Sequence, residues 1–200
     1  MDREADQHPH LRLSVATPPG WWDLPLDPIT RSGEIQRLVA RRMADAGEAE
    51  RAEMAGVLGT AADAAHRAGA VMASQFAVVG DGVHVAASMT LSVRPASAPP
   101  LLQAADDRVG ERQAAVDTVT MGPSGVARRK RCLRSLDLGR PEALEVLSVE
   151  YSFPVAGWAV EVVATFSSPT VEASGEMVAL FDAVAATVTF EVDGQGDRIQ

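Results

Sequence analysis

The sequence of 200 residues has one cysteine, Cys132, and no apolar run of the 18 or so residues that cross a bilayer. One thiol cannot form an internal disulfide, and with four scattered histidines it offers no zinc-ligand spacing. The charged start of the chain, Met1 to Leu11, is unlike a secretion signal. We therefore expect a cytoplasmic protein without a membrane span, metal or cofactor, whose fold depends on its hydrophobic core.

Cations are also scarce, since 18 Lys and Arg stand against 27 Asp and Glu, for a net charge of −9. Nucleic-acid binding depends on cations that release counterions from phosphates, so this balance argues against a general nucleic-acid binder. The charges are unevenly placed: five cations lie within residues 128–134, while ten acids and one arginine follow Pro141. Patches of opposite sign are expected, and they favour steered protein association. The absence of asparagine and the single lysine are typical of a high-GC bacterial genome.

Catalytic motifs are missing as well. No G-x-S-x-G elbow occurs, and Gly80 and Gly82 join two predicted strands, which indicates a hairpin turn and not a phosphate cradle. Cys132 lies among cations that could activate its thiol, but an ordinary strand residue is the favoured interpretation. His66 and His84 are predicted as surface or boundary residues. We assign no catalytic, cofactor-binding or metal-binding residue and expect no enzyme activity.

The hydrophobic content of 46% and the charged content of 22% are near the averages of globular domains. Periods in the pattern of apolar residues then predict the elements. Alternation at period two predicts strands at 11–15, 71–79, 83–93, 114–120, 126–136, 146–153, 158–166 and 188–192. Helical spacing predicts helices from Ser32, as N-cap, to Gly47, from Ala49 to Ala68, and over 172–187. Residues 94–113 are predicted as a loop with a short helix near 101–107.

This order predicts a single α+β domain over residues 11–192, with flexible tails at 1–10 and 193–200. Helices that have one apolar face must cover a sheet. The expected architecture is an α/β/α sandwich with a central, mostly antiparallel sheet, an inserted N-terminal helix pair and a C-terminal helix.

Parts of the chain resemble a known group of proteins. The segment Leu147 to Val188, with ATFSSP at 164–169 and LFD at 180–182, is similar to uncharacterised actinobacterial proteins of PsbP-like fold, as is GWWDLPL at 20–26. The resemblance covers about a third of the chain. It implies an α/β/α sandwich with an antiparallel sheet and an accessory or protein-binding role, and it transfers no catalytic residue. Relative to better-known members, the helix pair at 32–69 is an insertion.

The basic segment gives a residue-level hypothesis. If residues 126–136 pair with 146–153, and 147–153 pair with 158–166, then Arg131, Glu150 and Glu161 fall near one row of the sheet. A solvated row of charges is the favoured interpretation, a partner-docking patch is the functional one, and an acid pair of the glycosidase kind ranks last.

Alternation places Glu150 and Glu161 on the face opposite Tyr151 and Phe153. Burial of two carboxylates costs several kcal/mol each unless they are paired, so exposure or pairing with arginine is required. We predict that Arg129 or Arg131 reaches this face and that the patch contacts a partner.

Trp21 and Trp22 are predicted to pack at the edge of the core, with a contact surface as the alternative. The function expected from the sequence is a non-catalytic accessory or adaptor protein, acting through contacts with a protein partner or with itself on the charged sheet face. The first alternative is a small-molecule or lipid-binding domain with a pocket between sheet and helices. The second is a hydrolase of unknown class, which needs a cleft where Cys132 or a carboxylate meets a histidine.

Overall fold

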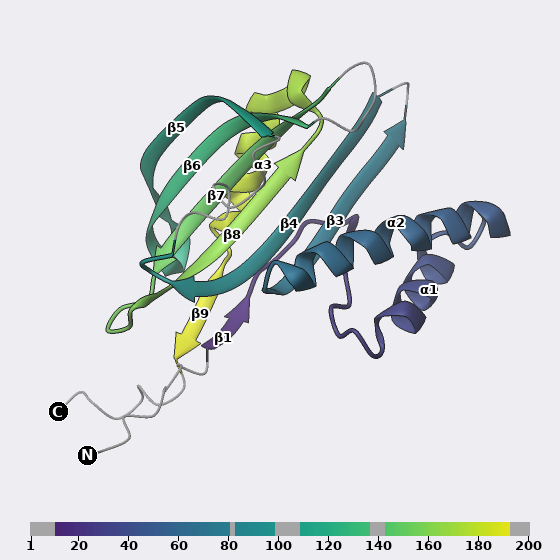
Figure 1. The fold of residues 1–200 in the computed structure, drawn as a ribbon, viewed down its shortest axis with the longest axis horizontal. Coiled ribbons are helices and arrows are strands. Elements are labelled where there is room, and N and C mark those ends of the chain that lie inside the picture. The colour runs from purple at the N-terminus through teal and green to yellow at the C-terminus, as the bar shows by residue number, and fades with distance from the viewer. Residues whose placement is uncertain (1–10, 81–82, 99–108, 137–142, 193–200) are drawn as a thin grey trace, which may run out of the picture.

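The computed structural model describes residues 11–80, 83–98, 109–136 and 143–192, and a curved seven-stranded sheet forms its centre (Figure 1). Neighbouring strands pair antiparallel in the order β2-β3-β4-β8-β7-β6-β5. The strands are β2 (Trp21–Asp23), β3 (Ala70–Gly80), β4 (Val83–Pro95), β5 (Val109–Met121), β6 (Gly125–Leu136), β7 (Leu144–Pro154) and β8 (Val160–Ser168). Near the two ends of the described chain, β1 (Leu11–Ser14) and β9 (Thr189–Val192) form a separate antiparallel pair.

Alternation along the central strands gives the sheet two different faces. On β7, Val149, Tyr151 and Phe153 point to one side, which we call the apolar face, and all three are fully buried. Ser148, Glu150 and Ser152 point to the other side, which we call the polar face. Both sets are buried, so the sheet has no open solvent face at its centre.

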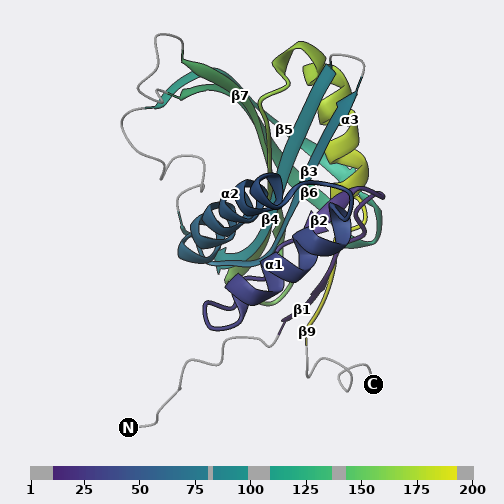
Figure 2. The ribbon, with the colours of Figure 1, turned by 90° about the vertical axis from the view of Figure 1, so that its right-hand side faces the viewer.

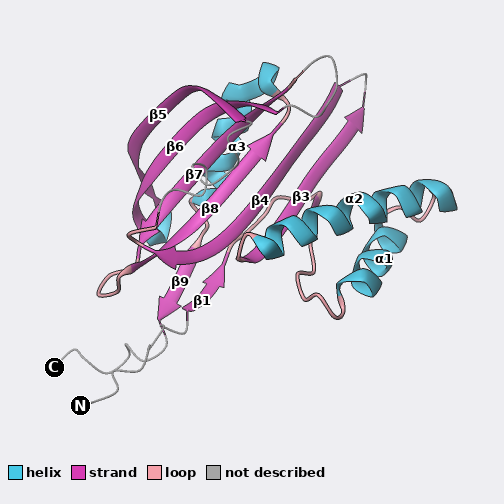
Figure 3. Cartoon of the chain, in the orientation of Figure 1, coloured by secondary structure: helices cyan, strands magenta, loops and turns pink. Residues whose placement is uncertain are grey.

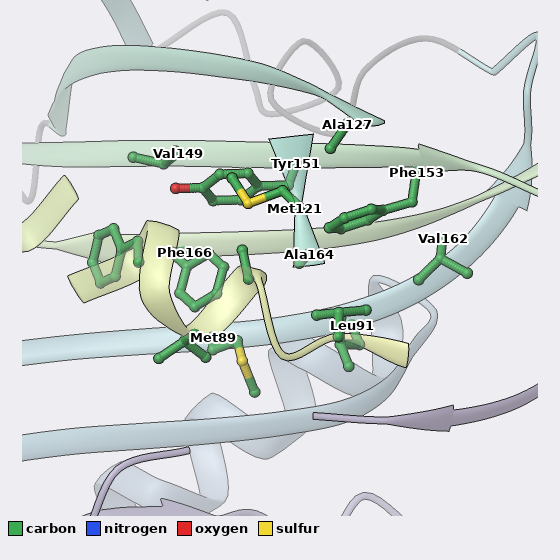
Figure 4. Packing of buried hydrophobic residues seen from close by; sticks show 14 of the residues in the cluster. Met89, Leu91, Met121, Ala127, Val149, Tyr151, Phe153, Val162, Ala164 and Phe166 are labelled. Carbon is green, nitrogen blue, oxygen red and sulfur yellow. The ribbon is translucent and has the colours of Figure 1, made fainter. Parts of the chain in front are cut away.

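The apolar face is covered by α3 (Ser174–Ala185), which follows the short 3-10 turn η3 (Val171–Ala173). Figure 4 shows the side chains of this core packed closely together. The Phe166 ring stacks on Phe181 with centroids 4.9 Å apart, and Tyr151 meets Phe166 edge-on at 5.6 Å. Full burial of each of these rings contributes roughly 1.5–3 kcal/mol.

The helix pair α1 (Arg31–Arg42) and α2 (Glu48–Arg67) packs beside β3, away from α3 (Figures 1 and 2). The helix pair contacts the side of β3 that carries Ala73, whereas Phe76 of β3 points to the apolar face. A second cluster of buried residues forms there. It consists of Leu24, Ile35, Leu38, Val39, Leu58, Ala62, Ala65 and Ala73. The predicted α+β class with a central antiparallel sheet is confirmed, and helices lie on both sides of the sheet.

Four predicted boundaries are wrong, at the two ends of α1, the end of β4 and the start of β5. The helix predicted from Ser32 begins at Arg31, because the turn at Asp27 already supplies a helical hydrogen bond, from the Arg31 amide to the Asp27 carbonyl at 2.9 Å. It ends at Arg42, before the predicted stop at Gly47. Residues 94 and 95 end β4, and residues 109–113, predicted as loop, begin β5. The predicted helix near 101–107 and both predicted tails lie outside the described residues.

Candidate partner-binding surface

The register of β6, β7 and β8 tests the predicted row of charges. Both predicted strand pairings are confirmed, but the row is wrong. Glu150 lies opposite Lys130 and Thr165, while Glu161 lies opposite Pro154. The β7–β8 turn is centred after Gly157, whose φ is +80°, and Val155 still pairs with Val160. This turn lies two residues beyond its predicted centre, so each partner on β8 shifts by four residues.

Glu150 and Glu161 nevertheless share the polar face, as alternation predicts, and they meet on Arg94 of β4. The Arg94 Nε donates to Glu161 Oε1 at 2.7 Å, and its Nη2 donates to Glu150 Oε1 at 3.0 Å and to Ser152 Oγ at 3.4 Å. Arg94 and Glu161 are directly opposite, so the guanidinium spans β8 to reach β7. We call these four residues the Arg94 cluster.

All members of the Arg94 cluster are buried, with 1% of Glu150, 7% of Arg94 and 8% of Glu161 exposed. The requirement that buried carboxylates be paired with arginine is therefore met. Such a cluster ties three strands together, but Glu150 presents almost no surface to a partner. Glu150 is therefore too buried to contact a partner in the way the sequence predicted.

Arg129 and Arg131 do not reach the polar face, which corrects the prediction. They lie opposite Tyr151 and Val149 on β7, so both point to the apolar face. The guanidinium of Arg129 binds two carboxylates there. It donates to Asp117 Oδ1 at 2.9 Å and Oδ2 at 2.5 Å, and to Asp182 Oδ1 at 2.8 Å and Oδ2 at 2.6 Å.

The same group of residues includes Tyr151, whose hydroxyl donates to Asp182 Oδ1 at 2.6 Å. Burial, reinforced by Asp182, raises the pKa of Tyr151 well above its usual value. The hydrogen bond from Arg129 lowers the pKa of Asp117, and the Asp117 hydrogen bond raises the pKa of Arg129. Arg129 of β6 thus forms ion pairs with Asp117 of β5 and Asp182 of α3, and these link the three elements.

Two further cations of the basic segment lie nearer to solvent. Arg131 is half-exposed, with 38% of its side chain accessible, and its Nη2 is 3.6 Å from Asp117 Oδ2. Arg128 is exposed on the polar-face side, opposite Thr118 of β5 and Ser152 of β7. Arg128 is therefore a cation close to the edge of the sheet.

β5 forms that edge (Figure 3). It has 13 residues, and among the described strands only β6 pairs with it in the sheet. Val116 is 62% exposed, and Thr118 and Thr120 are exposed on the same side. Val126 of β6, which is 54% exposed, extends this surface. The opposite edge strand, β2, has three residues and lies beside the helix pair.

The two tryptophans of β2 lie in different surroundings. Trp21 is buried and stacks on Phe76 with ring centroids 5.8 Å apart, in agreement with packing at the core edge. Trp22 is half-buried against the cluster of the helix pair. Its contact with a partner stays a prediction.

Cys132 and His66, the two candidate catalytic side chains that the structure describes, lie in different surroundings. Cys132 is buried on β6, whereas His66 is exposed on α2; the side chain of His84 lies outside what the structure describes. No three His, Cys, Asp or Glu side chains in the described ranges are placed to hold a metal ion. A groove of about 600 Å³ lies between α1 and α2 and opens to solvent. None of the helices in the described ranges has the length and apolar character to span a membrane.

Comparisons with known proteins leave the family open. No family model matches the chain, and no curated protein matches it. Among solved structures, the chain is similar to LpqN of Mycobacterium tuberculosis, described as involved in cell envelope biogenesis. The two share 9% sequence identity with a TM-score of 0.44, over 91% of this chain and 84% of LpqN. A likeness at this level assigns neither a family nor a role to the chain, so the PsbP-like assignment stays a prediction.

Sequence reasoning missed Arg94 and the edge position of β5. Arg94 continues the alternating polar positions Ser88, Thr90 and Ser92 of β4. Extending this alternation by two residues would have placed Arg94 on the polar face. The place of β5 at the edge of the sheet follows from the order of the strands, and the periodicity of a single strand does not predict that order.

Proposed function

We propose that this protein is a non-catalytic accessory protein that binds a protein partner by adding a strand of that partner to the edge of β5. The observation that supports the proposal is the long edge of β5, with its exposed Val116, Thr118 and Thr120. An edge strand presents backbone N–H and C=O groups, and an extended segment can pair with them while its side chains contact alternate positions.

The common protections of an edge strand are weak on β5. Its residues 114–121 contain no proline and no lysine, and Asp117, their one charged residue, is held by Arg129 on the apolar face. The bulge between Arg112 and Ala115 limits the regular edge on one side, and the turn at Gly122 limits it on the other. About seven residues, Ala115 to Met121, are left for regular pairing.

A ligand pocket is the competing hypothesis, because a small-molecule or lipid-binding domain needs an apolar cavity between sheet and helices. In the described structure the space between the sheet and α3 is filled by Tyr151, Phe166 and Phe181. The groove between α1 and α2 is lined in part by Arg31, Glu48 and other polar residues. These features favour the partner-binding proposal over a lipid pocket.

The test is photocrosslinking followed by amide hydrogen exchange. A benzophenone amino acid at Thr118 in the native host should give a covalent adduct with one protein. At Val57, which is 54% exposed on α2 and serves as the matched control, it should not. The purified adduct partner should then slow amide exchange in residues 114–121 of the unmodified protein more than in residues 71–77 of β3.

Two results would contradict the proposal. Equal crosslinking from Thr118 and Val57 would mean that the edge is not a preferred surface. A partner that binds without slowing exchange in β5 would place the contact elsewhere.

A further inference from the structure

We infer that the segment bound by β5 is acidic, with carboxylates on the polar-face side next to Arg128. This inference rests on the proposed function, because it names the chemistry of the strand that adds to β5. It starts from the position of Arg128, which is exposed, lies on β6 and faces Thr118 across the pair.

The distance fits such a contact. Strands in a sheet are about 4.8 Å apart, so an added strand would lie about 10 Å from the backbone of β6. Arginine and glutamate side chains together bridge that separation along the exposed surface of Thr118. Arg131 lies on the other face near Asp117, and Lys130, on the polar face, lies opposite the buried Glu150, so the inference depends on Arg128.

Local charge outweighs the net charge of the chain at this edge. The protein carries −9 overall, which repels an acidic segment at long range. At 0.15 M salt the Debye length is about 8 Å, so charges beyond the strands next to the edge are largely screened. Asp117 and Asp182 are bound by Arg129 on the apolar face, and Glu150, on the same face as Arg128, is bound by Arg94.

A second copy of the chain is less suited to this edge. Antiparallel pairing of β5 with itself would offer Val116, Thr118 and Thr120 to the polar-face side, and none of these carries a carboxylate. It would also bring two copies of Arg128 toward one another. A partner strand with alternating acids supplies the charge that a second β5 lacks.

The experiment is an NMR titration of the ¹⁵N-labelled full chain with three capped ten-residue peptides. Each alternates valine or threonine with one variable residue, which is Glu, Gln or Lys. In 0.15 M salt, we expect shifts of the amides of residues 114–121 and a Kd about threefold to fivefold lower for the Glu peptide than for the Gln peptide, as for one exposed ion pair. The Lys peptide should bind most weakly.

Two charge-matched variants locate the effect. Arg128→Gln should reduce the ratio of the two Kd values to near one, whereas Arg41→Gln, an exposed arginine on α1, changes the net charge equally and should leave the ratio intact. Raising the salt to 0.5 M should weaken the preference for Glu.

The outcomes separate the inference from the proposed function. Equal Kd values for the Glu and Gln peptides, with both peptides shifting β5 amides, would overturn the acidic specificity and leave edge binding in place. If none of the three peptides shifts these amides, recognition at the edge itself is wrong. Concentration-dependent protection of β5 without peptide would identify a second copy as the occupant and overturn the inference.

Discussion

Replacing Arg94 with methionine leaves Glu150 and Glu161 buried without the guanidinium that both carboxylates contact. Only 1% of Glu150 and 8% of Glu161 are exposed, so water does not readily take the place of Arg94. Removing one member of a buried ion pair costs about 3–5 kcal/mol, because the remaining charge stays buried. We expect Arg94→Met to lower the free energy of unfolding by an amount in this range.

The companion variants identify the cause. Arg94→Met combined with Glu161→Met removes an unpaired charge, so the double variant should be more stable than Arg94→Met alone by at least about 1.5 kcal/mol. Arg94→Lys keeps the positive charge but loses the planar fork, and a smaller loss of about 1–2 kcal/mol is expected. Arg128→Met, at an exposed position on the same side of the sheet, should change stability by no more than about 0.5 kcal/mol.

Urea unfolding followed by circular dichroism measures these differences. With a slope of about 2 kcal/mol per molar urea, a loss of 3–5 kcal/mol lowers the midpoint by about 1.5–2.5 M. If Arg94→Met is too unstable to fold, Arg94→Lys retains a measurable transition. A loss below about 1 kcal/mol in Arg94→Met, or a double variant less stable than Arg94→Met, would refute the account of the Arg94 cluster.

Two further changes test other parts of the structure. The pKa of Asp117 is lower in the folded protein than in the unfolded chain, so its ionised carboxylate stabilises the fold above its ordinary pKa. This stabilisation is lost as the pH falls through the lower, folded pKa, so the stability difference between wild type and Asp117→Asn should shrink from pH 5 to pH 2 in acid titrations. A constant difference would contradict this. Gly122 has φ +35°, and a Cβ there would overlap the Ala186 carbonyl oxygen, so Gly122→Ala should cost about 2–3 kcal/mol in urea, while Gly59→Ala, in open space on α2, should cost nothing.

Short-range patterns predicted most of the fold. The alternation of Val149, Tyr151 and Phe153 on β7 and the helical spacing of Met177, Phe181 and Val184 on α3 depend on neighbouring residues alone, and both elements lie where the periods place them. The end of β4 was missed because residues 94–113 are rich in proline, alanine and aspartate and so predict a loop, although proline is tolerated at the end of a strand.

The site was predicted only in part, because its geometry depends on long-range register. The sequence identifies the face of Glu150 and Glu161, since a side chain's face follows from alternation. It does not identify their partner, because Arg94 comes from β4, which joins β8 through pairing across more than 60 residues of chain. A displacement of the hairpin turn by two residues was enough to remove the predicted opposition of the two glutamates.

The buried Arg94 cluster lies at the centre of the sheet, and the open edge is β5. The two are connected through strand register. A slip of β7 by one residue would turn Glu150 into the apolar core and Tyr151 onto the polar face, so the Arg94 cluster and the Arg129 ion pairs both disfavour it. Fixing β7 also fixes β6, and with it the side on which Arg128 stands beside β5. The acidic preference proposed for the edge therefore depends on the buried cluster through strand register, although Glu150 and Glu161 need not touch the partner.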